Sequence, residues 1–121
     1  MTDTPTAEVQ AHAGRAADLI RDREHWCTGV RARDEHGVIV PPDSDYAVQW
    51  CAFGALERTE HSSDAHEIKD VTAAAVGALK RRGAKPGPGE DSVAVVTTFN
   101  DMVGHSAIVS LLDEVAGVWD E

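Results

Sequence analysis

The sequence predicts a mainly α-helical protein, a compact bundle of about four helices with room for a small β-hairpin. Apolar residues recur at helical spacing in residues 7–24 and 64–82, and residues 50–56 are apolar or small throughout. The chain has 121 residues, and one domain usually takes about 100–200. We therefore expect residues 7–121 to form a single helical domain, preceded by a disordered tail at residues 1–6.

The first expected helix covers residues 7–24. Its apolar positions return every three or four residues, which places them on one face with Arg and Asp on the other; they are Val9, Ala13, Ala16, Ala17 and Ile20. Trp26 follows the helix, and a large aromatic residue at a helix end commonly closes one side of a core. We expect Trp26 to do so here.

The next segment is expected to be irregular, because glycines and the pair Pro41-Pro42 interrupt helix. Two short strand-like runs, residues 30–32 and 38–40, flank a polar turn. A hairpin at residues 29–40 would fit this pattern, although two strands alone are marginally stable unless they pack against helices.

A central helix is expected at residues 45–59, with Asp43 or Ser44 accepting hydrogen bonds from its first N–H groups. A helix without a polar face belongs inside a structure. Gly54 costs about 1 kcal/mol of helix propensity relative to Ala, so we expect it to permit a close approach between helices.

The helix at residues 64–82 has clear end signals. Asp64 and Glu67 have the spacing of a capping box, and basic residues precede Gly83, where positive charge suits the helix dipole. After a loop rich in Pro and Gly, the β-branched residues 93–99 predict a short strand.

The last helix is expected to begin at Ser106, whose side chain can cap it. Its apolar residues recur three or four positions apart; they are Ile108, Leu112, Val115 and Trp119. These residues should form one face.

The composition excludes several classes of function. Eleven Lys and Arg against twenty-one Asp and Glu give a formal net charge of −10, which repels phosphate backbones, so we expect no nucleic-acid partner. Solubility explains this acidity. An acidic decoy that inhibits a nucleic-acid enzyme is the weaker alternative.

The two cysteines, Cys27 and Cys51, are too few for a disulfide framework. The chain opens without the apolar region of a secretory signal and has no run of about 18 apolar residues. We therefore expect a cytoplasmic protein without membrane contact, in which both thiols stay reduced.

Three phrases, taken in order, resemble a known family. They are Ala16-Ala17-Asp18-Leu19-Ile20 leading to Trp26, the apolar phrase at residues 50–56, and Phe99-Asn100-Asp101 before the last helix. Together they are similar to a family of small bacterial and phage-borne helical domains of unknown function, with a Trp-ended first helix, a Cys-x-x-Gly-Ala helix and an aromatic-Asn-Asp motif. The family usually has Trp in place of Phe99 and a shorter segment at residues 32–42. The resemblance implies a helical fold and no particular activity.

Cys51 is the first candidate for chemistry. A helix N-terminus stabilises a thiolate, and a His can act as its base. The residues that would supply the oxyanion donor, nucleophile, orienting group and base of a thiol-dependent hydrolase or transferase are Gln49, Cys51, Asn100 or Asp101, and His105. With a cap at residues 43–44, however, Cys51 lies inside its helix, beyond the reach of the dipole. Cys is also often buried for packing alone, so we favour a core role.

Asn100 and Asp101 are candidates for binding as well. Before a helix, Asn and Asp commonly accept backbone N–H groups in a turn, and Gly104 is free to take a positive φ; a ligand contact is the alternative. Trp119 is the third binding candidate, because an exposed Trp beside Ile108 and Leu112 would form an interface. No spacing typical of a metal site occurs, so we expect no metal and no cofactor.

These observations favour a non-enzymatic protein-interaction module, which binds a protein partner or a second copy of itself through its outer helices. The alternative is a thiol-dependent enzyme with Cys51, His105 and Asp101. That enzyme requires the Cys51 sulfur within about 4 Å of a His nitrogen.

Overall fold

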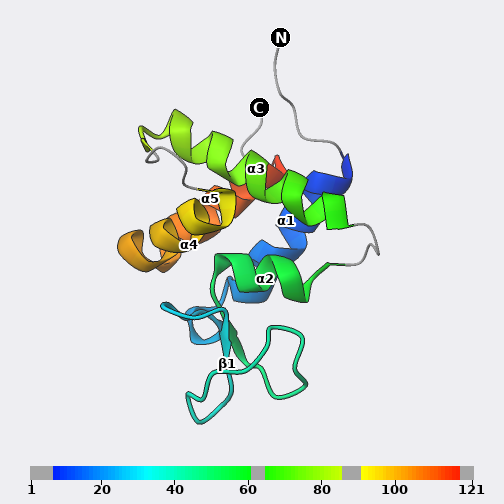
Figure 1. Ribbon diagram of the computed structural model, residues 1–121, viewed down its shortest axis with the longest axis vertical. Helices are drawn as coiled ribbons and strands as arrows, with labels where there is room; N and C mark the ends of the chain where they lie inside the picture. The colour runs from blue at the N-terminus through cyan, green and yellow to red at the C-terminus, as the bar shows by residue number, and fades with distance from the viewer. Residues whose placement is uncertain (1–6, 61–64, 86–90, 118–121) are drawn as a thin grey trace.

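The computed structural model describes residues 7–60, 65–85 and 91–117. This part of the chain is mainly helical (Figure 1). Its elements, in order, are α1 (Ala7–Ile20), the short 3-10 helix η1 (Arg23–His25), β1 (Ala32–Arg33), β2 (Gln49–Trp50), α2 (Ala52–Arg58), α3 (Ala65–Arg81), α4 (Ser92–Val103) and α5 (His105–Ala116). The predicted helical bundle with a small antiparallel sheet is therefore confirmed.

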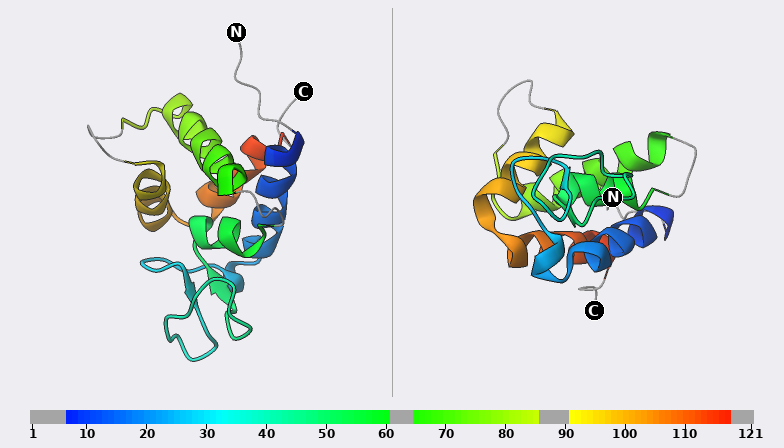
Figure 2. Two further views of the ribbon diagram at one scale, coloured as in Figure 1. Left: turned by 45° about the vertical axis from the view of Figure 1, so that its right-hand side comes forward. Right: turned by 90° about the horizontal axis from the view of Figure 1, so that it is seen from below.

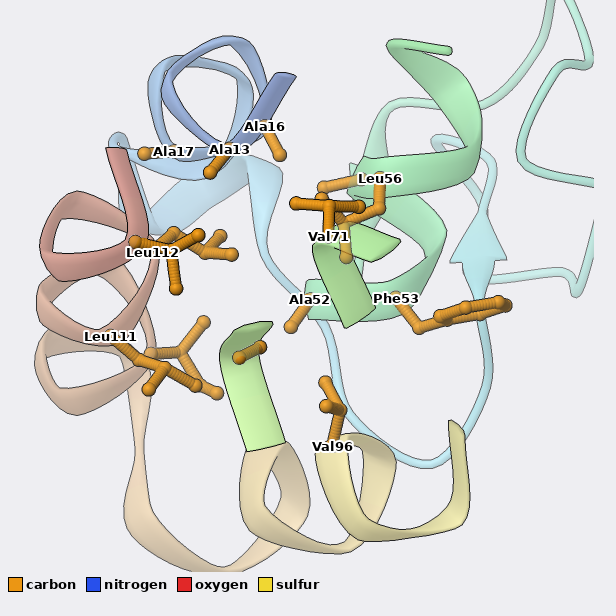
Figure 3. Packing of buried hydrophobic residues seen from close by; sticks show 14 of the residues in the cluster. Ala13, Ala16, Ala17, Ala52, Phe53, Leu56, Val71, Val96, Leu111 and Leu112 are labelled. Carbon is orange, nitrogen blue, oxygen red and sulfur yellow. The ribbon is translucent and has the colours of Figure 1, made fainter. Parts of the chain in front are cut away.

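One hydrophobic core joins the five described α-helices. α1 packs along α5 and against α2, and α3 contacts both α1 and α5 (Figure 2). Figure 3 shows the buried side chains converging between these helices, with Ala13 and Ala17 of α1 beside Leu112 of α5. α2 is the central helix that the apolar phrase predicted, since Ala52 to Leu56 are all buried.

α2 begins later than predicted, because residues 45–50 form turns and a strand instead. Ser44 stabilises a local turn, in which its Oγ accepts a hydrogen bond from Tyr46 N at 3.1 Å. The N-cap of α2 is Cys51 itself, in extended backbone with φ −79° and ψ 177°. The predicted helix start at residue 45, its cap at residues 43–44 and the place of Cys51 inside the helix are therefore wrong.

The predicted hairpin forms as part of a wider arrangement of strands. Its turn is closed by an antiparallel bridge between Arg33 and Ile39. The other edge of β1 pairs with β2, and a parallel bridge joins Trp26 to Trp50. Residues 27–48 thereby form a lobe beyond α2, at the lower end of the molecule in Figure 1, and we call them the loop lobe.

Residues 93–99 are helical and belong to α4, so the predicted strand is wrong. Asp91 caps this helix, and its carboxylate accepts a hydrogen bond from Ala94 N at 2.8 Å. Val95 and Val96 enter the core. Burial of these side chains outweighs the roughly half a kcal/mol by which each Val disfavours a helix.

α5 begins at His105 without a side-chain cap, so the predicted cap at Ser106 is wrong. Gly104 separates α4 from α5 and has a positive φ of 93°, as predicted. Asn100 and Asp101 lie in the last turn of α4 rather than in a separate turn.

Several predicted features lie outside the described residues; they are the tail at residues 1–6, the capping residue Asp64, most of the Pro- and Gly-rich loop and Trp119. Each helix in the described part of the chain is too short or too polar to cross a bilayer.

Candidate functional site at the base of the loop lobe

The side chain of Asn100 connects three segments of the chain, and it is fully buried. Its Oδ1 accepts hydrogen bonds from Trp26 Nε1 at 2.8 Å and from Ala52 N at 3.0 Å. Its Nδ2 donates to Cys27 O and to Asp101 Oδ1, both at 3.1 Å. These four bonds use the full hydrogen-bonding capacity of the amide. The geometry therefore gives Asn100 a structural role, in which it holds the entry of the loop lobe against α2 and α4.

Asp101 fixes the first turn of the loop lobe and is exposed. Its Oδ1 accepts a hydrogen bond from Gly29 N at 2.9 Å. Gly29 has a φ of 81°, a left-handed conformation that glycine adopts without a steric penalty. The carboxylate therefore orders the backbone beside it while remaining accessible from solvent.

The start of α2 lies against the backbone of the loop lobe. Cys51 Sγ accepts a hydrogen bond from Gly54 N at 3.3 Å, and Cys51 N donates to Arg31 O at 3.1 Å. A Cβ atom at Gly54 would overlap that same carbonyl oxygen. Gly54 thus permits a close approach, as expected, but to the lobe backbone and not to another helix.

A cleft of about 760 Å³ opens between the loop lobe and α4. This volume lies in the range of about 300–1,000 Å³ that is typical of ligand pockets. Its walls are mostly apolar and come from residues 39–42 and Val93. Polar residues at its edge are Arg31, Cys51, Thr97 and Asp101.

The surroundings of both cysteines favour the protonated thiol. Burial raises the pKa of Cys51 and outweighs the backbone N–H groups of Gly54 and Phe53, which favour the thiolate. Burial also raises the pKa of Cys27 to about 11, and the negative charge of Cys51 is the second cause. A nucleophilic cysteine needs the opposite shift.

His105 lies at another junction of the fold. Its Nε2 is 2.6 Å from Ile20 O, and its ring is in tilted contact with the ring of Trp26, with 5.6 Å between centroids. The hydrogen bonds of the described residues connect His105 neither to Cys51 nor to Asp101. The structure therefore brings Cys51 and Asp101 to one cleft and gives His105 a contact with the end of α1.

Three further residues of the predicted sites can be placed. Gln49, the expected oxyanion donor, donates from Nε2 to Glu24 O at 3.3 Å. Ile108 and Leu112, expected beside Trp119 at an interface, are fully buried. That part of the predicted interface is wrong, because both side chains belong to the core.

Exposed apolar side chains gather on the loop lobe instead. The large ones there are Val38 (57% exposed), Ile39 (63%), Tyr46 (76%) and Val48 (37%). Sequence reasoning missed this surface, because it treated residues 38–40 only as part of a hairpin. The signal was the unbroken apolar run of residues 38–40, since successive side chains of a strand point to opposite faces and cannot all reach the core.

No group of three or more His, Cys, Asp or Glu side chains in the described ranges converges as metal ligands would. The fold and the site define a small, mainly helical protein with a loop lobe fixed to the ends of two helices.

The chain belongs to DUF6197, a family of unknown function, whose model matches residues 4–118. The predicted membership of a family of unknown function is thereby confirmed. Comparison with curated proteins and with solved structures finds no match.

Proposed function

We propose that this protein is a non-enzymatic protein-interaction module whose loop lobe binds an apolar and basic segment of a partner protein. The supporting observation is that four large apolar side chains are exposed on this one lobe and that two of them, Val38 and Val48, share one face. Exposed apolar groups gathered in one place are typical of interaction sites, whereas scattered ones are ordinary.

The strand register explains how this apolar surface arises. Val38 and Val48 lie on either side of Asp34, whose N–H donates to Val38 O at 2.9 Å. Side chains two positions apart along a strand share one face. The two valines therefore continue the face that carries the half-buried Val40 and the buried Trp50. An apolar strip runs from the core to the surface, where a partner segment can extend it.

The charge of the loop lobe indicates the composition of the partner. The loop lobe, residues 27–48, contains four carboxylates, all within residues 34–48, against the two arginines Arg31 and Arg33. A segment that carries Lys or Arg between apolar residues is attracted to such a surface, and an acidic one is repelled. A second copy of this chain has a net charge of −10, so a different protein is favoured over a homo-oligomer.

The two alternative functions find less support. A thiolate–imidazole pair is disfavoured by the raised pKa of Cys51 and by the contact of His105 with Ile20 O. A decoy of nucleic acid needs unpaired carboxylates in a row, whereas Asp113 and Glu114 of α5 are paired with arginines. We place this module in the cytoplasm, because a reducing compartment keeps its two free thiols reduced.

The test is selection of a phage-displayed library of random peptides on the immobilised full-length protein. Enriched peptides should combine Lys or Arg with aliphatic or aromatic residues, and their binding should weaken as salt screens the charges. The double variant Val38→Ser/Val48→Ser should bind the enriched peptides about tenfold more weakly in fluorescence anisotropy.

Met102→Ser is the matched control, since Met102 is 78% exposed but lies at the end of α4. It should leave peptide affinity unchanged. Enrichment of acidic peptides, no enrichment at all, or an equal loss in Met102→Ser would refute the proposal.

A further inference from the structure

Two cysteines meet where the loop lobe leaves the helical part of the chain and where it returns. A parallel bridge joins Trp26 to Trp50, and Cys27 N donates to Trp50 O at 3.1 Å. Cys27 and Cys51 each directly follow one of these tryptophans. The ladder ends there, because the amide of Asn100 takes the place of a direct bond between Ala52 N and Cys27 O, but the bond from Cys27 N to Trp50 O keeps the two cysteines in adjacent segments.

This adjacency places the two thiols within reach of each other. Neighbouring strands lie about 4.8 Å apart, and residues opposite each other direct their side chains to the same face. Disulfides join residues whose Cα atoms are about 4.4–6.8 Å apart. Cys27 and Cys51 are both free thiols, and a bond between them requires the Cys27 thiol to turn away from Val30 O, to which it donates at 3.7 Å.

The two thiols also share their charged neighbours. Asp101 on α4 disfavours both thiolates, Arg33 favours that of Cys27, and Arg31 favours that of Cys51. Such effects fall off with distance, so the shared carboxylate agrees with this adjacency in placing the sulfurs close together. Cys51 is 3% exposed but is among the residues that line the cleft, so a small oxidant in the cleft lies next to it.

We propose that Cys27 and Cys51 form a redox modification site, in which hydrogen peroxide converts them into an intrachain disulfide that ties together the two ends of the loop lobe. The proposal is independent of the binding function, because it concerns the base of the lobe and not its exposed surface.

The reaction balances with one peroxide. The Cys51 thiolate attacks one peroxide oxygen, which breaks the O–O bond and yields a sulfenic acid on Cys51 and, after protonation, one water. The Cys27 thiolate then attacks the sulfenic sulfur, forms the S–S bond and releases a second water. Two thiols are oxidised, and the peroxide is reduced to two waters.

The rate of this reaction should rise with pH. Only thiolates react, and burial holds the pKa of Cys27 at about 11 and raises that of Cys51. At neutral pH the disulfide should therefore form slowly.

The test treats the native full-length protein with hydrogen peroxide at neutral and at alkaline pH. Intact mass spectrometry should show the loss of two hydrogen atoms, restored by dithiothreitol, with faster loss at alkaline pH. Peptide mapping without reductant should join the peptide of Cys27 to that of Cys51. In Cys27→Ser, Cys51 should instead gain oxygen atoms.

Two outcomes would overturn the proposal. One is thiols that stay reduced in the native protein and oxidise only when urea is present, which would make both cysteines inert core residues. The other is oxidation that yields dimers linked between chains and no intrachain link. Both readouts use the unaltered chain, so they hold even where a variant fails to fold.

Discussion

The helical body and the loop lobe of this protein are held together by different forces. In the body, aliphatic side chains such as Ile20, Leu79 and Leu111 are fully removed from water, and each contributes roughly 1.5–3 kcal/mol by burial. In the loop lobe, the large aliphatic side chains of Val38 and Ile39 are exposed. The lobe is attached through hydrogen bonds to Asn100 and Asp101, through the pairing of β1 with β2, and through bonds from the side chains of Trp50 and Arg58 to Pro42 O.

The residues that stabilise the fold are therefore different from the residues that are exposed on the loop lobe. The body resists change at many positions, because its core is shared among five helices. The loop lobe depends on a few directional contacts at its base, so their loss should release it while the helices remain packed. Under the proposed function, its exposed residues are the ones that contact a partner.

The largest effect is expected for Asn100→Ala. The change removes the partner of Trp26 Nε1, Ala52 N and Cys27 O at once. Leaving buried polar groups unsatisfied costs about 1–3 kcal/mol each, so urea unfolding should show a loss of about 4 kcal/mol. Thr98→Ala, at an exposed position of the same helix, should cost less than about 0.5 kcal/mol. Equal effects of the two changes would contradict the role of Asn100.

Gly54→Ala should have the next largest effect. Its Cβ would overlap Arg31 O, so α2 and the loop lobe would have to separate, at about 3 kcal/mol. Hydrogen exchange should show faster opening of the lobe than of α5. Gly77→Ala is the matched control, because the nearest atom to its Cβ is Arg81 Nη1 at 3.7 Å, and it should stabilise α3 by about 0.5–1 kcal/mol. A neutral Gly54→Ala would mean that the lobe is not closely packed on α2.

A smaller effect that depends on pH is expected for Glu114→Gln in the helical body. Burial works against the charged form of Glu114, but hydrogen bonds from Arg82 at 2.8 Å and Arg81 at 3.0 Å outweigh it and lower its pKa. A lowered pKa in the folded state gives stability that is present above the unfolded pKa and is lost as the pH falls through the folded value.

Glu114→Gln should therefore cost about 1 kcal/mol at neutral pH and almost nothing well below pH ~4. Urea unfolding of both proteins at the two pH values measures the difference. Glu35→Gln, at an exposed position of the loop lobe, should change stability at neither pH. A cost of Glu114→Gln that stays the same in acid would show that packing, not charge, holds this residue.

The sequence predicted the helical body well, because the apolar spacing that identifies a helix lies within a few consecutive turns of the chain. The apolar spacing of α1 and α3 identifies both helices, and the unbroken apolar phrase correctly identifies α2 as central. The failure within the body was α4, where the β-branched residues were interpreted as a strand and the N-cap signal of Asp91 was missed.

The loop lobe was harder to predict, because it depends on contacts between distant residues. The bridge from Trp26 to Trp50 turns the expected first turns of α2 into a strand and makes Cys51 the helix cap. Cys51 and Asp101 could be named from the sequence as site residues. That Asn100 saturates its amide with three segments follows only from the folded chain.

The smallest effect on stability is expected for Tyr46→Ser, on the most exposed large apolar side chain of the loop lobe. Little area is buried there, so the free energy of unfolding should change by less than about 0.5 kcal/mol, whereas Leu112→Ala in the body should cost about 3 kcal/mol. Urea unfolding at two protein concentrations compares them. A large loss for Tyr46→Ser that grows as the protein concentration is raised would show that this side chain is buried between copies of the chain. The comparison of the two regions would then change, because the partner of the loop lobe would be a second copy rather than a different, basic protein.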